Sequence, residues 1–280
     1  MFTSACGGPA THKALTAEEQ FAQAQKLYNK KKYFQSAEEF QKVIYNYPGA
    51  NIIDTAQFYL ANSYLKDEQY QLAAVEFERL VKNYPRSDFA PDSRFLAGYA
   101  RYLAAPRHYG LDQSELLTAI GLIEDFIIDY PDSKLIPEAE KTLKEAHTRL
   151  AKKAFKSGVV YVHIRAYESA LIYFQKVIDD YPDTKYAALA LLEMGKVQFK
   201  KKDFTKAAAT FNTFLAQYPE HKLTGEARDQ LSEVEKKLAE LAPATTAQSG
   251  SSSVDSLSVP HLPHLEDTNS ALNSEDPENH

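Results

Sequence analysis

The stretch YESALIYFQKVIDDYP, residues 167–182, carries the pattern that decides the fold. Its apolar residues recur at steps of three and four, as at Tyr167, Ala170 and Phe174, which places them on one face of a helix. Proline lacks the backbone N–H that a continuing helix needs, and it restricts the residue before it. The helix is therefore predicted to stop at Tyr181-Pro182.

Four other segments of the chain end in the same dipeptide after a similar pattern. The five Tyr-Pro pairs begin at residues 47, 84, 130, 181 and 218, at spacings of 37, 46, 51 and 37 residues. A second helical pattern precedes each of them and carries a small residue midway: Ala24, Ala61, Gly98, Gly158 and Gly195. Because a small residue lets a partner helix come close, each unit is predicted to be a pair of helices in a repeat architecture.

The repeated unit resembles the tetratricopeptide (TPR) repeat, in which a tight turn joins such a helix to a Tyr-x-x-Ala-x-x-x-Phe helix and a closing proline. The predicted fold is all-α, a TPR-like superhelical solenoid of five helix pairs. Residues 223–241 alternate charged and apolar side chains at helical spacing and are predicted to form a C-terminal capping helix. A solenoid of this kind favours binding over catalysis.

Two spacings exceed 37 residues, and each excess has its own interpretation. The nine extra residues of the third repeat centre on Pro106-Arg107-His108-Tyr109-Gly110, which we interpret as a loop between its two helices. The fourteen extra residues of the fourth repeat are interpreted as a lengthened first helix, from about Pro137 to His163. Asp112, three residues before Glu115, is predicted to cap the helix that follows the loop.

Composition divides the 280 residues into three parts. Residues 1–16 are expected to hold a truncated signal sequence and a linker, residues 17–241 the repeats with their cap, and residues 242–280 a disordered acidic tail rich in Ser and Pro. The tail has six of the 38 acidic residues and no Lys or Arg, so residues 1–241 are balanced at 32 basic and 32 acidic residues. A balanced solenoid without a basic stripe argues against nucleic acid as a partner.

The residue types that carry catalysis and metal binding are not grouped in this sequence. The eight histidines are scattered, one cysteine cannot complete a zinc site or a disulfide, and no glycine-rich phosphate loop is present. No apolar run approaches the roughly 18 residues that span a membrane. We therefore predict no enzymatic activity, no metal and no cofactor.

Cys6, the only cysteine, stands in a context that resembles the lipobox of bacterial lipoproteins. Small residues precede it and Gly7-Gly8 follow it. The resemblance implies that a signal peptide is cut before Cys6 and that this residue is acylated, for example with palmitate. In enterobacterial lipoproteins an Asp after the cysteine retains the protein at the inner membrane, and Gly7 occupies that position here. The alternative is a thiol without a role in a flexible N-terminus.

Several features together resemble the BamD (YfiO, ComL) family of outer-membrane β-barrel assembly lipoproteins. They are Cys6, the insert at residues 106–114, the long fourth-repeat helix and the run Tyr181-Pro182-Asp183-Thr184. The resemblance covers about residues 6–241 and implies a lipid-anchored scaffold at the periplasmic face of the cell outer membrane. It implies partners of three kinds: the periplasmic domains of a BamA-like barrel protein, other assembly lipoproteins, and unfolded outer-membrane proteins bound through their C-terminal β-signal.

The TPR resemblance also implies which residues line the concave surface, since positions 5, 9 and 12 of each first helix face it. With Ala24, Ala61 and Gly98 at position 8, the predicted peptide-binding groove consists of Phe21, Gln25, Tyr28, Phe58, Asn62, Leu65, Phe95, Tyr99 and Tyr102. Aromatic side chains offer a large contact area at a small entropic cost, so they suit an amphipathic β-signal that ends in an aromatic residue. The alternative is that the phenylalanines only pack adjacent repeats together.

A second function stays open at this point. Soluble periplasmic TPR adaptors of the CpoB (YbgF) type, which coordinate envelope constriction, carry similar Tyr-Pro repeats. Those proteins begin with a coiled coil, whereas no heptad pattern precedes the first repeat here. This difference favours the assembly scaffold.

Overall fold

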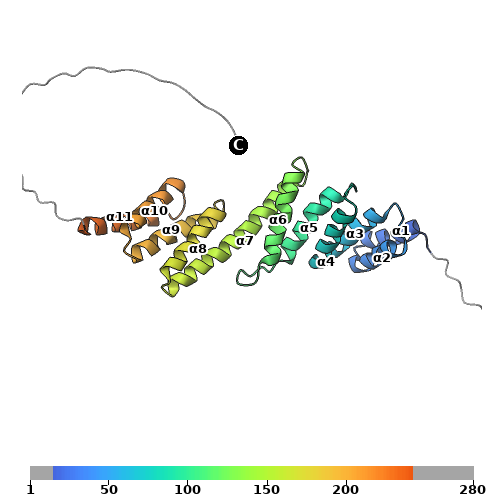
Figure 1. Cartoon of the computed structure of the whole chain (residues 1–280), viewed down its shortest axis with the longest axis horizontal. Coiled ribbons are helices and arrows are strands. Elements are labelled where there is room, and N and C mark those ends of the chain that lie inside the picture. The colour runs from blue at the N-terminus through green and yellow to red at the C-terminus, as the bar shows by residue number, and fades with distance from the viewer. Residues whose placement is uncertain (1–14, 242–280) are drawn as a thin grey trace, which may run out of the picture. The chain divides into compact units, whose positions relative to one another are not determined.

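The computed structural model describes residues 15–241, where the chain forms eleven helices and no strand (Figure 1). The helices are α1 (Ala17–Asn29), α2 (Tyr33–Asn46), α3 (Ile53–Lys66), α4 (Tyr70–Asn83), α5 (Ala90–Ala104), α6 (Ser114–Asp129), α7 (Ile136–His163), α8 (Tyr167–Asp180), α9 (Lys185–Lys200), α10 (Phe204–Gln217) and α11 (Thr224–Leu241). Five helix pairs are thus followed by one C-terminal helix. The predicted all-α, TPR-like solenoid is confirmed.

Each helix packs against the next one along the chain, as Figure 1 shows for the row from α1 to α11. First helices of neighbouring repeats also touch, α1 with α3, α5 with α7 and α7 with α9. The apolar core therefore continues from one repeat to the next, as in other solenoids.

All five Tyr-Pro pairs end a helix in the same way. The tyrosine is the first residue after the helix, with φ between −136° and −128° and ψ between 50° and 58°. Its carbonyl oxygen accepts a hydrogen bond from the backbone N–H three residues later, as from Ala50 to Tyr47 at 3.0 Å. The predicted stops are confirmed at every repeat.

A second recurring turn joins the two helices of a pair in four of the five repeats. The residue two positions before the second helix has a left-handed backbone: Lys31, Glu68, Arg165 and Lys202, with φ between 58° and 66°. The next N–H reaches back to the first helix, as from Lys32 to the Leu27 carbonyl at 3.0 Å. This is the Schellman arrangement, which satisfies the last carbonyls of a helix and fixes the direction of the next one.

In the fourth and fifth repeats the small residue of the first helix lies where the phenylalanine of the second helix packs, and in the third repeat Gly98 lies against Ile123. A Cβ added at Gly158 would lie 2.6 Å from Phe174 Cε1, and one added at Gly195 would lie 2.6 Å from Phe211 Cε1. Both rings are fully buried. The predicted role of the small residue, close approach of the partner helix, is confirmed at these positions.

The two lengthened repeats differ from the others as expected, with one exception. Residues 105–113 form a loop between α5 and α6, and α7 is a single helix of 28 residues. The prediction that Asp112 caps α6 is wrong, because the N-cap is Gln113 and it makes no side-chain capping bond. The Gln113 side chain instead donates to the carbonyls of Pro106, His108 and Leu111 at 3.2–3.3 Å. Gln113 is only 4% exposed, and its side-chain amide forms hydrogen bonds with carbonyl groups of the loop instead of capping the helix.

Cys6, the expected signal sequence and the acidic tail 242–280 lie outside the described residues. Between residues 15 and 241, none of the helices combines the length and the apolar character needed to cross a bilayer.

Candidate peptide-binding groove

The nine predicted groove residues come from three first helices, α1, α3 and α5. Seven of them are half-buried, and none is fully exposed. The other two differ from the expectation, because Phe95 is only 1% exposed and Tyr102 only 6% exposed. The part of the predicted groove that a ligand can reach is therefore smaller than the sequence suggested: Phe21, Gln25, Tyr28, Phe58, Asn62, Leu65 and Tyr99. We refer to these seven residues as the aromatic strip.

Tyr59 on α3 is the centre of the ring contacts in the first two repeats. Its ring centroid lies 6.2 Å from that of Phe21, 5.4 Å from that of Tyr28 and 5.7 Å from that of Phe40. Sequence reasoning missed this residue. The sequence did contain one indication of its role. The equivalent positions 37 residues away are Ala22 and Leu96, so an aromatic side chain at this position is specific to the second repeat.

Phe58 joins the second repeat to the third. Its ring stacks on that of Phe89, with centroids 4.4 Å apart and an angle of 20° between the planes. Phe89 is the N-cap residue of α5. Phe58 and Phe21 therefore do pack adjacent repeats together, as the alternative interpretation held, while both keep part of their surface open to solvent. The two interpretations are compatible for these rings.

Tyr102 is buried because the lengthened α7 covers it. Its hydroxyl donates to Glu145 Oε2 at 2.6 Å, and the Arg149 guanidinium lies 4.0 Å from its ring centroid. Burial raises the pKa of Tyr102, and the hydrogen bond to Glu145 raises it further. Tyr102 thus connects α5 to α7 and is a structural residue of the junction between them.

Phe95 is buried by the other helix of its own pair. Its ring packs against Phe126 of α6, with centroids 5.4 Å apart, and stacks on Tyr99 at 5.8 Å. Tyr99 in turn stacks on Tyr102 at 6.2 Å. The Tyr99 ring is consequently fixed between Phe95 and Tyr102, and it remains half-buried at the surface of the third repeat.

Two tyrosines of the aromatic strip offer neutral hydroxyl groups. Burial raises the pKa of both Tyr28 and Tyr99 above the usual tyrosine value, so both stay protonated at neutral pH. Within residues 15–241 neither hydroxyl is engaged in a hydrogen bond. The Asn62 amide donates to the Phe58 carbonyl at 3.0 Å, which leaves its oxygen to accept. Rings with uncharged donors and acceptors suit an amphipathic, extended peptide.

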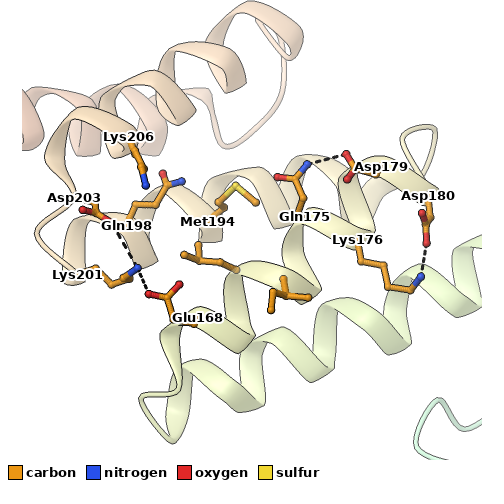
Figure 2. Close-up of a pocket in the computed structure, with 12 residues that line it drawn as sticks. Glu168, Gln175, Lys176, Asp179, Asp180, Met194, Gln198, Lys201, Asp203 and Lys206 are labelled. Carbon is orange, nitrogen blue, oxygen red and sulfur yellow. Dashed lines mark hydrogen bonds and ion pairs between the residues drawn. The ribbon is translucent and has the colours of Figure 1, made fainter.

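Another cleft, of about 610 Å³, lies between α8, α9 and α10, and Figure 2 shows its lining. Met194 contributes to its apolar wall. The rim is charged, but Lys201 pairs with Glu168, and Lys176 pairs with Asp180 at 2.5 Å. Because Lys201 and Lys176 are already paired, a charged ligand would gain little from these two ammonium groups. Lys206 also lines the cleft and has no ion pair among residues 15–241.

A larger cleft of about 820 Å³ lies over α2, α3 and α4, where Tyr45 is 87% exposed beside Leu60. The sequence did not predict either cleft, because each one is built from three helices that meet only in the fold. Among residues 15–241, no three His, Cys, Asp or Glu side chains gather as a metal ion would require.

Comparison with known proteins gives two family matches. The profile of the family described as "YfiO: Outer membrane lipoprotein" matches residues 13–200. A tetratricopeptide-repeat profile matches residues 189–221. One similar relative is the "Outer membrane protein assembly factor BamD" of Rickettsia prowazekii (strain Madrid E), 29% identical over 175 residues. That match covers 60% of this chain and 66% of the relative, just under two thirds of its length.

Solved structures with a similar course of the chain are more distant in sequence. The TPR2AB domain of yeast Sti1 has a TM-score of 0.36 at 12% identity, and the match covers 78% of this chain and 98% of that one. MamA of Desulfovibrio magneticus has a TM-score of 0.34 at 14% identity, with coverages of 74% and 97%. Values this low carry no information on function.

Proposed function

Because the chain belongs to the YfiO family of outer membrane lipoproteins, we propose that it is a non-enzymatic scaffold for the assembly of proteins into the outer membrane. The name of its relative, an outer membrane protein assembly factor, supports this role. The structural observation that carries the proposal is the aromatic strip on the first helices of the first three repeats. It offers contact area and neutral polar groups, and none of its residues is a nucleophile or an acid–base pair.

The ligand of the aromatic strip, in this proposal, is the C-terminal β-signal of an unfolded outer-membrane protein. Such a segment is extended and amphipathic, and its terminal aromatic residue can pack beside Phe21, Phe58 or Tyr99. The protein would hold this client and dock on the periplasmic domains of a BamA-like barrel protein, together with other assembly lipoproteins. Binding energy alone serves this role, without nucleotide or metal.

A depletion experiment tests the proposed role. When the protein is depleted from cells that carry its gene, we expect the amounts of folded outer-membrane barrels to fall, because their assembly lacks its scaffold. Heat-modifiable mobility on gels measures the folded fraction, and a periplasmic soluble protein serves as the control. Unchanged barrel levels together with a defect in envelope constriction would contradict the proposal and favour the CpoB-type adaptor.

Lipidation at Cys6 is the second part of the proposal and gives the localisation. An acyl chain contributes about 0.8 kcal/mol for each buried methylene, so several chains anchor a protein without a spanning helix. We propose that the protein is held in this way at the periplasmic face of the outer membrane.

Metabolic labelling with palmitate tests the anchor. Since Cys6 is the only cysteine, we expect label on the native protein and none on the Cys6→Ala variant at equal expression. The native protein should fractionate with outer membranes, and the variant should lose this association. Equal labelling of the two proteins, or none on either, would refute lipidation at Cys6.

A further inference from the structure

The two departures from the 37-residue repeat meet at one surface. The loop 105–113 and the lengthened α7 are far apart in the sequence, yet the Lys153 ammonium donates to the Leu111 carbonyl at 3.1 Å. The Lys152 ammonium lies 5.5 Å from the ring centroid of Tyr109. Because the buried Gln113 side chain holds the loop from the inside, this surface is preformed.

The charge of this surface is one-sided, although the repeats as a whole are balanced. Residues 146–167 include five Lys or Arg and no Asp or Glu. Four of these cations, Arg149, Lys152, Lys153 and Lys156, follow one another at steps of three, one and three, which places them in a single row along α7. The expectation that the solenoid has no basic stripe is therefore wrong for α7.

The cations of this row have no salt-bridge partner among residues 15–241. Every ion pair found there involves other lysines, arginines or His147. Two carboxylates near the row, Asp112 and Glu145, accept from the Ser114 hydroxyl at 2.5 Å and from the Tyr102 hydroxyl. The Ser114 hydrogen bond, with a smaller contribution from the charge of Lys153, lowers the pKa of Asp112, but neither acid lies within salt-bridge distance of the row. Unpaired like charges in one row repel each other, so an added anion would be stabilised there.

A cleft with apolar walls opens beside the row. It has a volume of about 390 Å³ between α6, α7 and α8, and Leu117, Leu150, Ala154 and Tyr173 form its apolar lining. Lys153, Lys176 and Asp112 also line it. Leu117 is 58% exposed, so its side chain is available for contact.

We propose that Arg149, Lys152, Lys153 and Lys156, together with this cleft, bind an acidic segment of a partner protein that places an apolar side chain in the cleft. Charge complementarity favours an acidic ligand, and the cleft favours a chain segment over a bilayer, because a flat lipid surface does not enter a concavity. This surface lies on α6, α7 and α8, so it is distinct from the aromatic strip on α1, α3 and α5. The proposal does not depend on the function of that strip.

The charged row is tested with a fluorescein-labelled peptide of alternating glutamate and leucine. Fluorescence anisotropy measures the affinity of the protein for this peptide. The triple variant Lys152→Gln, Lys153→Gln, Lys156→Gln is expected to bind about tenfold more weakly, because each exposed ion pair contributes about 0.5 kcal/mol. The matched control is Lys66→Gln, Lys82→Gln, Lys134→Gln, which removes the same charge from exposed, unpaired sites on α3, on α4 and before α7. The control should bind within about twofold of the native protein.

A second variant tests the cleft. Leu117→Ser is expected to weaken the same peptide about fivefold, because an exposed leucine can contribute roughly one kcal/mol of apolar contact. Leu72→Ser on α4, at a similarly exposed leucine, should have no effect. Native-like affinity of the triple variant, or an equal loss in its control, would overturn the proposal. Binding of anionic phosphatidylglycerol vesicles, but not of the peptide, would overturn it in favour of a lipid surface.

Discussion

Replacing Gly195 with leucine is expected to lower the free energy of unfolding by about 3 kcal/mol. The added Cβ alone would lie 2.6 Å from Phe211 Cε1 and 2.7 Å from its Cζ. The Phe211 ring is fully buried, so it cannot turn aside without disturbing its neighbours. The gain of about 1 kcal/mol from removing a glycine within a helix is too small to offset this overpacking. Gly158→Leu should behave in the same way against Phe174.

Gly121 provides the matched control, since it is also inside a helix but nothing lies within 4 Å of a Cβ added there. Gly121→Ala is expected to raise the free energy of unfolding by up to about 1 kcal/mol, because only helix propensity changes. Urea denaturation followed by circular dichroism measures both variants. A Gly195→Leu variant as stable as the native protein would show that the two helices of the pair are not packed this closely.

The fold was predictable because its signals are local. Tyr-Pro ends a helix through the backbone of two residues. The glycine of the first helix faces an apolar side chain of the second helix of the same pair, as Gly98 faces Ile123 and Gly195 faces Phe211. The same local reasoning located the loop at Pro106–Gly110 and the long helix up to His163. Each of these signals acts within one repeat, so the sequence of that repeat contains it.

The features that the sequence did not reveal depend on contacts between repeats. Tyr102 shares the helical face of Tyr99, and only the position of α7 over α5 decides that Glu145 and Arg149 bury it. The N-cap of α6 is Gln113 and not Asp112, and the Gln113 side chain binds the loop carbonyls, a contact that spacing alone does not indicate. The cationic row was hidden by the overall charge balance, since acidic residues elsewhere in the repeats compensate for it.

The double variant Tyr28→Ala, Tyr99→Ala is expected to weaken binding of a β-signal peptide about thirtyfold, because a buried aromatic contact contributes about 1 kcal/mol or more to peptide affinity and two are lost. These two residues are chosen because both are half-buried and both have hydroxyls without a partner among residues 15–241. Tyr102 is unsuitable, since its removal would also break the contact between α5 and α7.

The control for this variant removes a similar pair of rings from the fifth repeat. Phe199 and Phe204 are half-buried and contact each other with ring centroids 5.4 Å apart. Phe199→Ala, Phe204→Ala should cost comparable stability but leave the affinity for the peptide unchanged. Circular dichroism of both double variants establishes that the helices persist, so a difference in affinity reports on the aromatic strip.

Isothermal titration calorimetry measures most directly whether the aromatic strip is the client site. Two peptides are compared: one that ends in a β-signal, and the same peptide with alanine in place of its terminal aromatic residue. We expect the native protein to bind the first peptide about tenfold more tightly than the second, and the Tyr28→Ala, Tyr99→Ala variant to lose this preference. Equal affinity of the native protein and the variant for the β-signal peptide would contradict the assignment of the strip as the client-binding surface.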